Sequence, residues 1–256
     1  MSPLVRRLVQ LYAGLTLYGA SAGLILLSTL GNDPWDVFHQ GLSRQTGIGT
    51  GIWVCLVGAL VLLLWIPLRQ RPGLGTVSNV IVIGVVLELV LVAFDPPAAL
   101  PARVALLVAG VVLNGVATGM YIGARFGPGP RDGLMTGLAA RGRSLRAVRT
   151  GIELTVLALG ALLGGTVGVG TVVYALAIGP LAHVFVPLFT VPDQPPRRST
   201  RASHGARRSP GPGSHVASSS SAAAHASASG RSTSTASPDQ LASTSTSTPS
   251  RRRVYA

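Results

Sequence analysis

The chain has 256 residues, of which 48% are hydrophobic and only 11% are charged. Its mean hydropathy is +0.49. This balance excludes an ordinary soluble domain, because a soluble fold needs far more charged surface. The net charge of +13 comes entirely from arginine, since the sequence has no lysine, and this excludes chemistry that depends on a lysine side chain.

Six apolar runs are long enough to cross the roughly 30 Å hydrocarbon core of a bilayer. Each is predicted to be a helix, because an open sheet edge in lipid would leave backbone groups unpaired. The runs are Leu8 to Leu30, Thr50 to Leu68, Thr76 to Phe94, Arg103 to Ala124, Arg146 to Leu163 and Gly170 to Phe189. The sequence therefore predicts an all-α polytopic membrane protein with the lipid bilayer as its environment.

Two stretches share the pattern G-x-x-P-x-D-x-x-x-x-G-L. Gly31 to Leu42 reads GNDPWDVFHQGL, and Gly127 to Leu138 reads GPGPRDGLMTGL. When the chain is compared with itself at an offset of 96 positions, twelve of the 36 residues from Arg7 to Leu42 are identical. At an offset of 95, the glycines, threonine and valine of residues 73–77 match those of residues 168–172. This self-similarity predicts a duplicated unit, and residues aligned in this way are called repeat counterparts below.

Three helices per copy is an odd number, so the second copy is predicted to be inverted in the membrane relative to the first. The expected organisation is a first membrane repeat at residues 1–95 and an inverted repeat at 96–190. A tail rich in Ser, Thr, Pro and Arg follows at 191–256, and its composition predicts disorder. Arginine is concentrated in the second and fourth loops, which places both termini in the cytoplasm of a bacterial inner membrane. Because this charge follows topology, no nucleic-acid partner is expected.

A short helix is predicted at each copy of the shared pattern. Pro34 and Pro130 suit the first position of a helix, and Asp36 and Asp132 would follow in the first turn, where the helix dipole favours a carboxylate. Both segments are too short to span, so they are interfacial helices or re-entrant segments, with a plain loop as the less favoured alternative. We expect His39, in the first segment, to be solvated at the interface.

Glycines recur at every fourth position on two of the predicted helices. This spacing is typical of faces on which transmembrane helices pack closely. The residues are Gly19, Gly23, Gly115, Gly119 and Gly123. The single cysteine, Cys55, lies inside a predicted span and excludes an intramolecular disulfide.

Ionisable residues within apolar runs are costly and are the first candidates for function. Glu88 and His183 are repeat counterparts in the third and sixth runs. If the copies pack about a twofold axis, these two side chains could approach one another and form a proton-coupled site. Alternatively, each makes a single hydrogen bond to a neighbouring helix.

Other charged residues cluster around the second copy of the pattern. Arg131 and Asp132 either receive an anion at a helix N-terminus or hold the short segment against the bundle. Arg149 and Glu153, four residues apart, are expected to form a local ion pair. Together with Asp36, these residues are candidates for a pathway or substrate site.

No motif for hydrolysis, redox chemistry or metal binding is present in the sequence. It has no HExxH, no paired histidines at ligand spacing and no Ser/His/Asp arrangement that stands out. We therefore expect no catalytic residues, no cofactor and no metal site, and a protein that is not an enzyme.

The stretch GPGPRDGLMTGL, with the later VRTGIEL, GGTVGVGT and ALAIGP, resembles the YczE-like membrane proteins, a bacterial group akin to the YitT-type proteins. The resemblance runs from Gly31 to about Pro180 and leaves out the tail. That group usually has a small or polar residue where Pro130 stands. The resemblance implies a polytopic inner-membrane protein. The residues that correspond to its motif are Arg131, Asp132, Gly133, Glu153, Gly170 and Thr171.

These features favour a transporter or permease for a small solute or a proton, in which the two P-x-D segments meet near the membrane midplane. The alternative is a non-transporting membrane protein that partners or regulates another membrane complex. In that case its glycine faces would contact the partner or a second copy of the chain.

Overall fold

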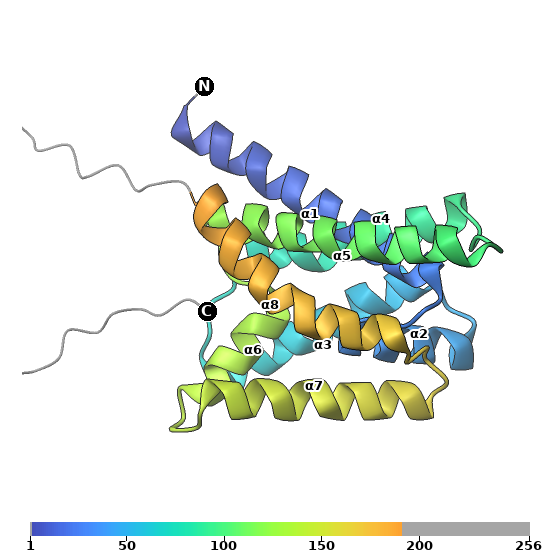
Figure 1. The fold of residues 1–256 in the computed structure, drawn as a ribbon. Coiled ribbons are helices and arrows are strands. Elements are labelled where there is room, and N and C mark those ends of the chain that lie inside the picture. The colour runs from blue at the N-terminus through green and yellow to red at the C-terminus, as the bar shows by residue number, and fades with distance from the viewer. Residues whose placement is uncertain (1, 191–256) are drawn as a thin grey trace, which may run out of the picture. The chain divides into compact units, whose positions relative to one another are not determined.

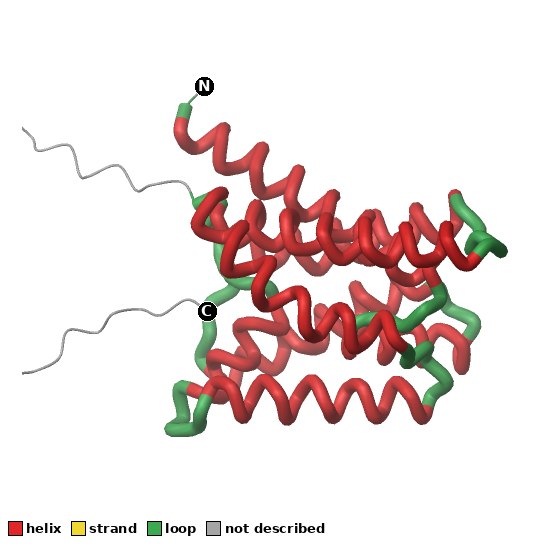
Figure 2. Tube along the Cα trace, viewed as in Figure 1, coloured by secondary structure: helices red, strands yellow, loops and turns green. Residues whose placement is uncertain are grey.

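The computed structural model describes residues 2–190. The tail predicted to be disordered lies outside the described residues. Within them the secondary structure is entirely helical (Figures 1 and 2). The helices are α1 (Pro3–Ser28), α2 (Pro34–Thr46), α3 (Thr50–Leu68), α4 (Leu74–Ala93), α5 (Leu100–Gly123), α6 (Pro130–Ala139), α7 (Leu145–Leu162) and α8 (Val169–Phe189).

Five of these helices are long and apolar enough to cross a membrane, namely α1, α3, α4, α5 and α8. This confirms the predicted all-helical membrane class. The remaining predicted span coincides with α7 to within one residue at each end. Because α7 carries Arg146, Arg149 and Glu153, it is more polar than the other long helices, and the structure shows five candidate spans where the sequence predicts six.

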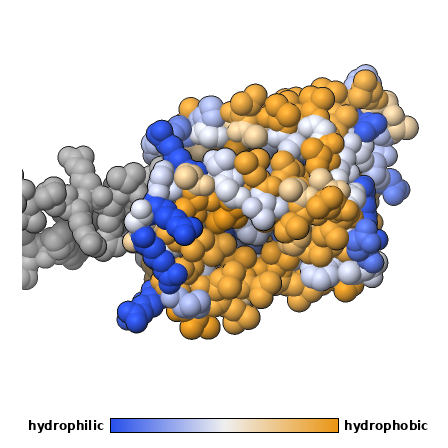
Figure 3. Space-filling model, turned by 90° about the horizontal axis from the view of Figure 1, so that it is seen from below, coloured by the Kyte–Doolittle hydropathy of each residue, from blue (hydrophilic) through white to orange (hydrophobic). Residues whose placement is uncertain are grey.

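The surface of the helical bundle is apolar where a bilayer would surround it. On the face shown in Figure 3, hydrophobic residues form a band between hydrophilic residues at two opposite ends. Large aliphatic side chains such as Val92 and Leu162 are about four-fifths exposed, at 79% and 83%. Such exposure is unfavourable in water and favourable in hydrocarbon, so the surface fits a lipid environment.

The two short helices begin as the sequence predicts. Pro34 and Pro130 are the first residues of α2 and α6, and Asp36 and Asp132 lie in the first turns. Asp33 caps α2, because its Oδ1 accepts hydrogen bonds from the backbone N–H groups of residues 35 and 36 at 2.9 and 3.3 Å. The cap residue of α6 is Gly129, which has no side chain for this role.

The repeated glycines lie at contacts between helices of this chain. A Cβ atom on Gly19 would lie 2.7 Å from the carbonyl oxygen of Ile83, in α4. One on Gly115 would lie 2.7 Å from Cβ of Leu181, in α8. Gly23 likewise faces α4, and Gly119 and Gly123 face α8. The glycines therefore bring α1 against α4 and α5 against α8.

Equivalent backbone hydrogen bonds link the two halves of the bundle. The N–H of Gly170 donates to the carbonyl oxygen of Leu30 at 2.8 Å, and the N–H of Gly75 donates to that of Phe126 at 3.0 Å. Gly75 and Gly170 are repeat counterparts, and so are Leu30 and Phe126. The start of α8 thus binds the segment before α2, and the start of α4 binds the segment before α6 through the equivalent hydrogen bond.

Candidate functional site

Arg131 of α6 reaches across to the first turn of α2. Its Nη1 lies 3.6 Å from Oδ1 of Asp33, and its Nη2 lies 3.7 Å from Oδ1 of Asp36. The guanidinium also stacks over the ring of Trp35, 5.0 Å from the ring centroid. Both distances to oxygen exceed a normal N–H···O hydrogen bond, so the contacts are ionic. Through these contacts Arg131 joins the start of α6 to the start of α2.

The carboxylates in this cluster are nearly closed to solvent, with Asp33 and Asp36 at 6% and 4% exposure. Burial and the charge of Asp36 raise the pKa of Asp33 to about 8, although Arg131 acts in the opposite direction. For Arg131, burial lowers the pKa, but the two carboxylates outweigh it and the net direction is upward. Burial therefore favours the protonated form of Asp33, and the charge of Arg131 favours its ionised form.

His39 is buried, with 1% exposure, and the expectation that it is solvated is wrong. Its Nδ1 lies 3.1 Å from Oδ1 of Asp36. Burial, and then the charge of Arg131, lower the pKa of His39 well below its usual value, so the ring is neutral. Because a carboxylate only accepts, Nδ1 of His39 donates to Asp36, which leaves Nε2 as an acceptor. The sequence does not show that α7 and α3 pack on α2.

Three buried polar atoms around α2 have no hydrogen-bond partner within the described residues. They are Asn32 Oδ1, Trp35 Nε1 and His39 Nε2. Unpaired buried groups cost free energy, and they are uncommon in folded proteins. Chemically, they offer two acceptors and one donor to a small polar ligand.

Four residues of this site, Asn32, Asp33, Trp35 and His39, are absent from the candidates drawn from the sequence. The repeat gave no second instance of them, because their counterparts are Pro128, Gly129, Arg131 and Met135. One signal for Asp33 was available. An aspartate directly before a proline is the usual start of a helix, which marks it as a cap buried with α2.

Asp132 has a different partner from its counterpart Asp36. The hydroxyl of Tyr121 donates to Asp132 Oδ2 at 3.1 Å. Tyr121 in turn packs edge-on against Tyr18, with ring centroids 5.9 Å apart. Asp132 is thus joined to α5 and α1, whereas Arg131, the residue before it, points to α2.

A second buried polar chain joins α1, α5 and α8. The hydroxyl of Tyr174 donates to Oδ1 of Asn114 at 3.0 Å, and Nδ2 of Asn114 donates to Oγ of Ser21, also at 3.0 Å. All three residues are buried. Tyr174 and Asn114 therefore fix α8 to the inner side of the bundle by polar contacts.

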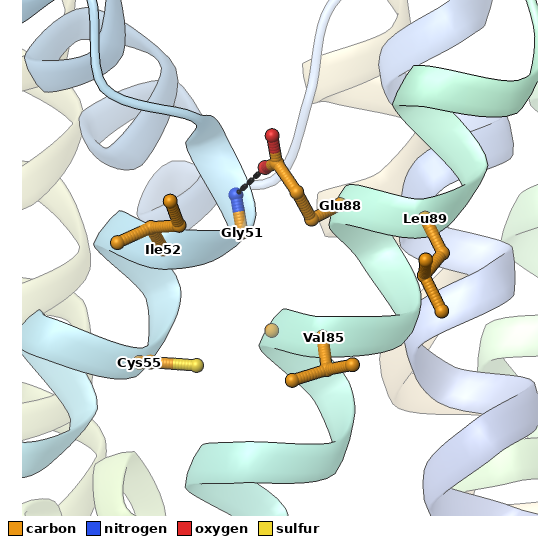
Figure 4. Close-up of a pocket in the computed structure, with 7 residues that line it drawn as sticks. Gly51, Ile52, Cys55, Val85, Glu88 and Leu89 are labelled. Carbon is orange, nitrogen blue, oxygen red and sulfur yellow. Dashed lines mark hydrogen bonds between the residues drawn. The ribbon is translucent and has the colours of Figure 1, made fainter.

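The remaining charged candidates lie apart from this cluster. Arg149 Nε donates to Oε1 of Glu153 at 2.9 Å, the local pair expected on α7. Oε2 of Glu88 accepts a hydrogen bond of 2.6 Å from the N–H of Gly51, in the first turn of α3 (Figure 4). His183 is exposed on α8, and no contact joins it to Glu88 in the described part of the chain. The structure therefore does not bring Glu88 and His183 together.

No group of three or more metal-ligating side chains that could hold an ion occurs among residues 2–190.

The model of a family of unknown function, DUF6198, matches residues 5–187. The chain belongs to the DUF6198 family. The match covers both short helices, so the Arg131 cluster lies within the DUF6198 region.

Curated relatives agree with this assignment. The chain is 42% identical over 173 residues to an uncharacterized protein of Haemophilus influenzae, covering 67% of this chain and 79% of that one. It is 32% identical over 187 residues to the uncharacterized membrane protein YczE of Bacillus subtilis, covering 72% and 87%. The uncharacterized protein YyaS of Bacillus subtilis is 29% identical, over 68% of this chain and 90% of its own.

These matches confirm the resemblance to the YczE-like membrane proteins and show that this DUF6198 protein is a membrane protein. No solved structure is significantly similar to the chain.

Proposed function

We propose that the protein is a small-solute transporter or permease whose binding site is the Arg131 cluster. The observation that carries this proposal is the contact of Arg131, at the start of α6, with Asp33 and Asp36, at the start of α2. Many transporters bind their substrate between helices that begin or break inside the membrane, at the interface of two repeats. The burial of Asp36 and His39 in α2 supports a re-entrant rather than an interfacial short helix.

The proposed organisation is two inverted repeats, residues 1–95 and 96–190, in a bacterial cytoplasmic membrane with both termini inside. Equivalent contacts in the two halves support it, above all the bonds from Gly75 to Phe126 and from Gly170 to Leu30. Under this organisation, the tail at residues 191–256 is cytoplasmic.

The charges of the cluster favour a cationic or zwitterionic solute. The guanidinium of Arg131 lies against two buried carboxyl groups, on Asp33 and Asp36, whereas Asp132 bonds to Tyr121. An amine could be held by these carboxyl groups and by the face of Trp35, and an acidic group on the same solute could be held by Arg131. The raised pKa of Asp33 also makes it the residue that would exchange a proton as the solute binds.

The alternative role, as a partner or regulator of another membrane complex, relied on glycine faces exposed to lipid. Gly19 and Gly23 instead contact α4, and Gly115 and Gly119 contact α8. These four glycines are therefore covered by helices of the same chain, and the proposal of transport does not depend on them.

Substituted-cysteine labelling tests the proposal. In a Cys55→Ser background, single cysteines replace Trp35, Asp36 or Asp132, and intact vesicles are treated with a charged, membrane-impermeant thiol reagent. We expect labelling at these positions, because a transported solute needs a path of water to the site. Labelling should slow when an amine substrate is present.

Two cysteine variants calibrate the experiment. Leu176→Cys, on the lipid-facing side of α8 with 72% exposure, and Leu27→Cys, buried in α1, should both stay unlabelled. Labelling at residue 36 with protection at residues 27 and 176 would support a solute pathway. Protection of residues 35, 36 and 132 from both sides of the membrane would contradict it.

A further inference from the structure

The two halves of the bundle differ in the contact between their last two helices, which are α3 and α4 in the first half and α7 and α8 in the second. In the first half, α3 packs on α4 through two glycines. A Cβ atom on Gly84 would lie 2.5 Å from the carbonyl oxygen of Gly51, and it would also collide with Sγ of Cys55. The backbones of α3 and α4 therefore touch at Gly51 and Gly84, and any larger side chain would separate them.

In the second half, the corresponding helices do not touch in this way. The counterpart of Gly84 is Gly179 on α8, which is exposed, and a Cβ atom there would meet no atom within 4 Å. The counterpart of Cys55 is Thr150 on α7, which is also exposed. Both α3 and α7 pack against α2 and α6, but α7 has no contact with α8 comparable to that between α3 and α4. We call the α3–α4 contact closed, because the two backbones touch, and the α7–α8 contact open, because they do not.

Glu88 fastens the closed contact. Its carboxylate accepts the hydrogen bond from the N–H of Gly51, one of the backbone groups that the first turn of α3 leaves unpaired. A carboxylate at that position is also favoured by the dipole of α3. Figure 4 shows Glu88 on α4 reaching over to Gly51, with Cys55 and Val85 projecting into the groove below them. That groove, of about 200 Å³, is lined by residues of both helices, Gly51 and Gly84 among them.

We propose that α3–α4 and α7–α8 are two gates that close alternately and that Glu88 is the latch of the first gate. The two copies of the repeated unit show two arrangements, one with its last two helices in contact and one with them apart. Because the copies are related, we infer that each can adopt either arrangement. Closure of α7 on α8 through Gly179 would then accompany the parting of α3 from α4. This inference rests on the proposed transport function, since alternating gates would expose the Arg131 cluster to opposite sides of the membrane.

Breaking the latch should therefore shift the protein towards the arrangement with α7 and α8 in contact. Hydrogen bonds to charged groups typically change an equilibrium constant by about ten- to a hundredfold. Glu88→Leu removes the acceptor and should produce the full shift. Glu88→Gln keeps a neutral acceptor oxygen and should produce a smaller one.

Oxidative cross-linking in membranes measures the shift. Thr150→Cys and Gly179→Cys are combined in a Cys55→Ser background, which places the only two thiols on α7 and α8. We expect a disulfide to form slowly with Glu88 present, about tenfold or more faster with Glu88→Leu, and at an intermediate rate with Glu88→Gln. A control pair, Ser21→Cys with Asn114→Cys, joins α1 to α5, and its rate should not depend on residue 88.

Two results would contradict the proposed gates. Either the cysteines at positions 150 and 179 never form a disulfide, or they form it at the same rate with Glu, Leu and Gln at position 88. If Glu88→Leu fails to fold, the rates of disulfide formation with Glu88 and with Glu88→Gln are compared instead, and equal rates would contradict the proposed gates. Cross-linking does not require transport, so the two proposals can fail separately. A labelled cluster with no change in cross-linking rejects the gate alone, whereas a change in cross-linking with a protected cluster supports the helix movement and rejects the solute path.

Discussion

Arg103 donates a hydrogen bond of 2.9 Å from its Nε to the carbonyl oxygen of Ser28, and so ties the first turn of α5 to the last residue of α1. Its repeat counterpart, Arg7, makes the same bond of 2.9 Å to the carbonyl oxygen of Ala124, the counterpart of Ser28. The last carbonyls of a helix lack intrahelical partners, and in lipid they have no water to pair with. Each arginine therefore satisfies carbonyls at the end of the helix from the other half.

This relationship predicts that Arg7→Ala and Arg103→Ala are both destabilising. Each change leaves carbonyl oxygens unpaired at a helix end, which should lower the free energy of unfolding by about 1–3 kcal/mol. Unfolding in mixed micelles measures the effect. Arg71→Ala is the matched control, because Arg71 is exposed in the loop before α4 and should change stability by less than about 0.5 kcal/mol. Equal stability of all three variants would contradict the prediction.

Most of the fold could be predicted because its signals are local. Uninterrupted apolar runs mark the five candidate spans, and a proline with an aspartate two residues later marks the start of each short helix. The duplicated pattern predicts two copies of one unit, and Arg7 and Arg103, which are identical in the two copies, make equivalent hydrogen bonds.

The site was less predictable, because it depends on which faces of the short helices are covered by neighbouring helices. The sequence could not show that Arg131 would bridge to Asp33, since the contact joins residues 98 positions apart in the chain. It also suggested that Glu88 and His183 occupy equivalent places. That inference assumes that both copies have the same packing, and the contacts at Gly84 and Gly179 differ.

Gly133→Ala should be strongly destabilising, whereas Gly151→Ala should not. A Cβ atom on Gly133 would collide with the ring of Trp65, which is only 2% exposed and has no room to move. Overpacking of this kind costs about 1–3 kcal/mol. A Cβ atom on Gly151, in α7, would meet nothing within 4 Å, and alanine there should stabilise the helix by up to about 1 kcal/mol. Thermal unfolding of both variants checks the contrast, and similar midpoints would refute it.

Trp65→Phe should separate the hydrogen bond of this tryptophan from its packing. Its Nε1 donates to the carbonyl oxygen of Pro130 at 3.0 Å and so holds the start of α6 against α3. Loss of the donor removes this buried hydrogen bond, at a cost of about 1 kcal/mol. Trp53→Phe loses a similar bond to Thr46 at an exposed position and should cost less. If the two variants unfold at the same denaturant concentration, the bond to Pro130 does not stabilise α6.

The raised pKa of Asp33, about 8, predicts that stability falls as the pH rises from 7 to 9. In the unfolded chain the pKa of Asp33 is near 3.8, so between about pH 4 and pH 8 the folded protein binds a proton that the unfolded chain has released. The stabilisation from this group is therefore fully present below about pH 4 and is lost as the pH rises through 8. Asp33→Asn cannot ionise but keeps a capping oxygen for α2, so its unfolding midpoint should change less between pH 7 and pH 9 than that of the wild type. Asp95→Asn, at an exposed position before α5, should keep the wild-type pH dependence. An Asp33→Asn variant with that same dependence would show that Asp33 is already ionised in the folded protein at pH 7.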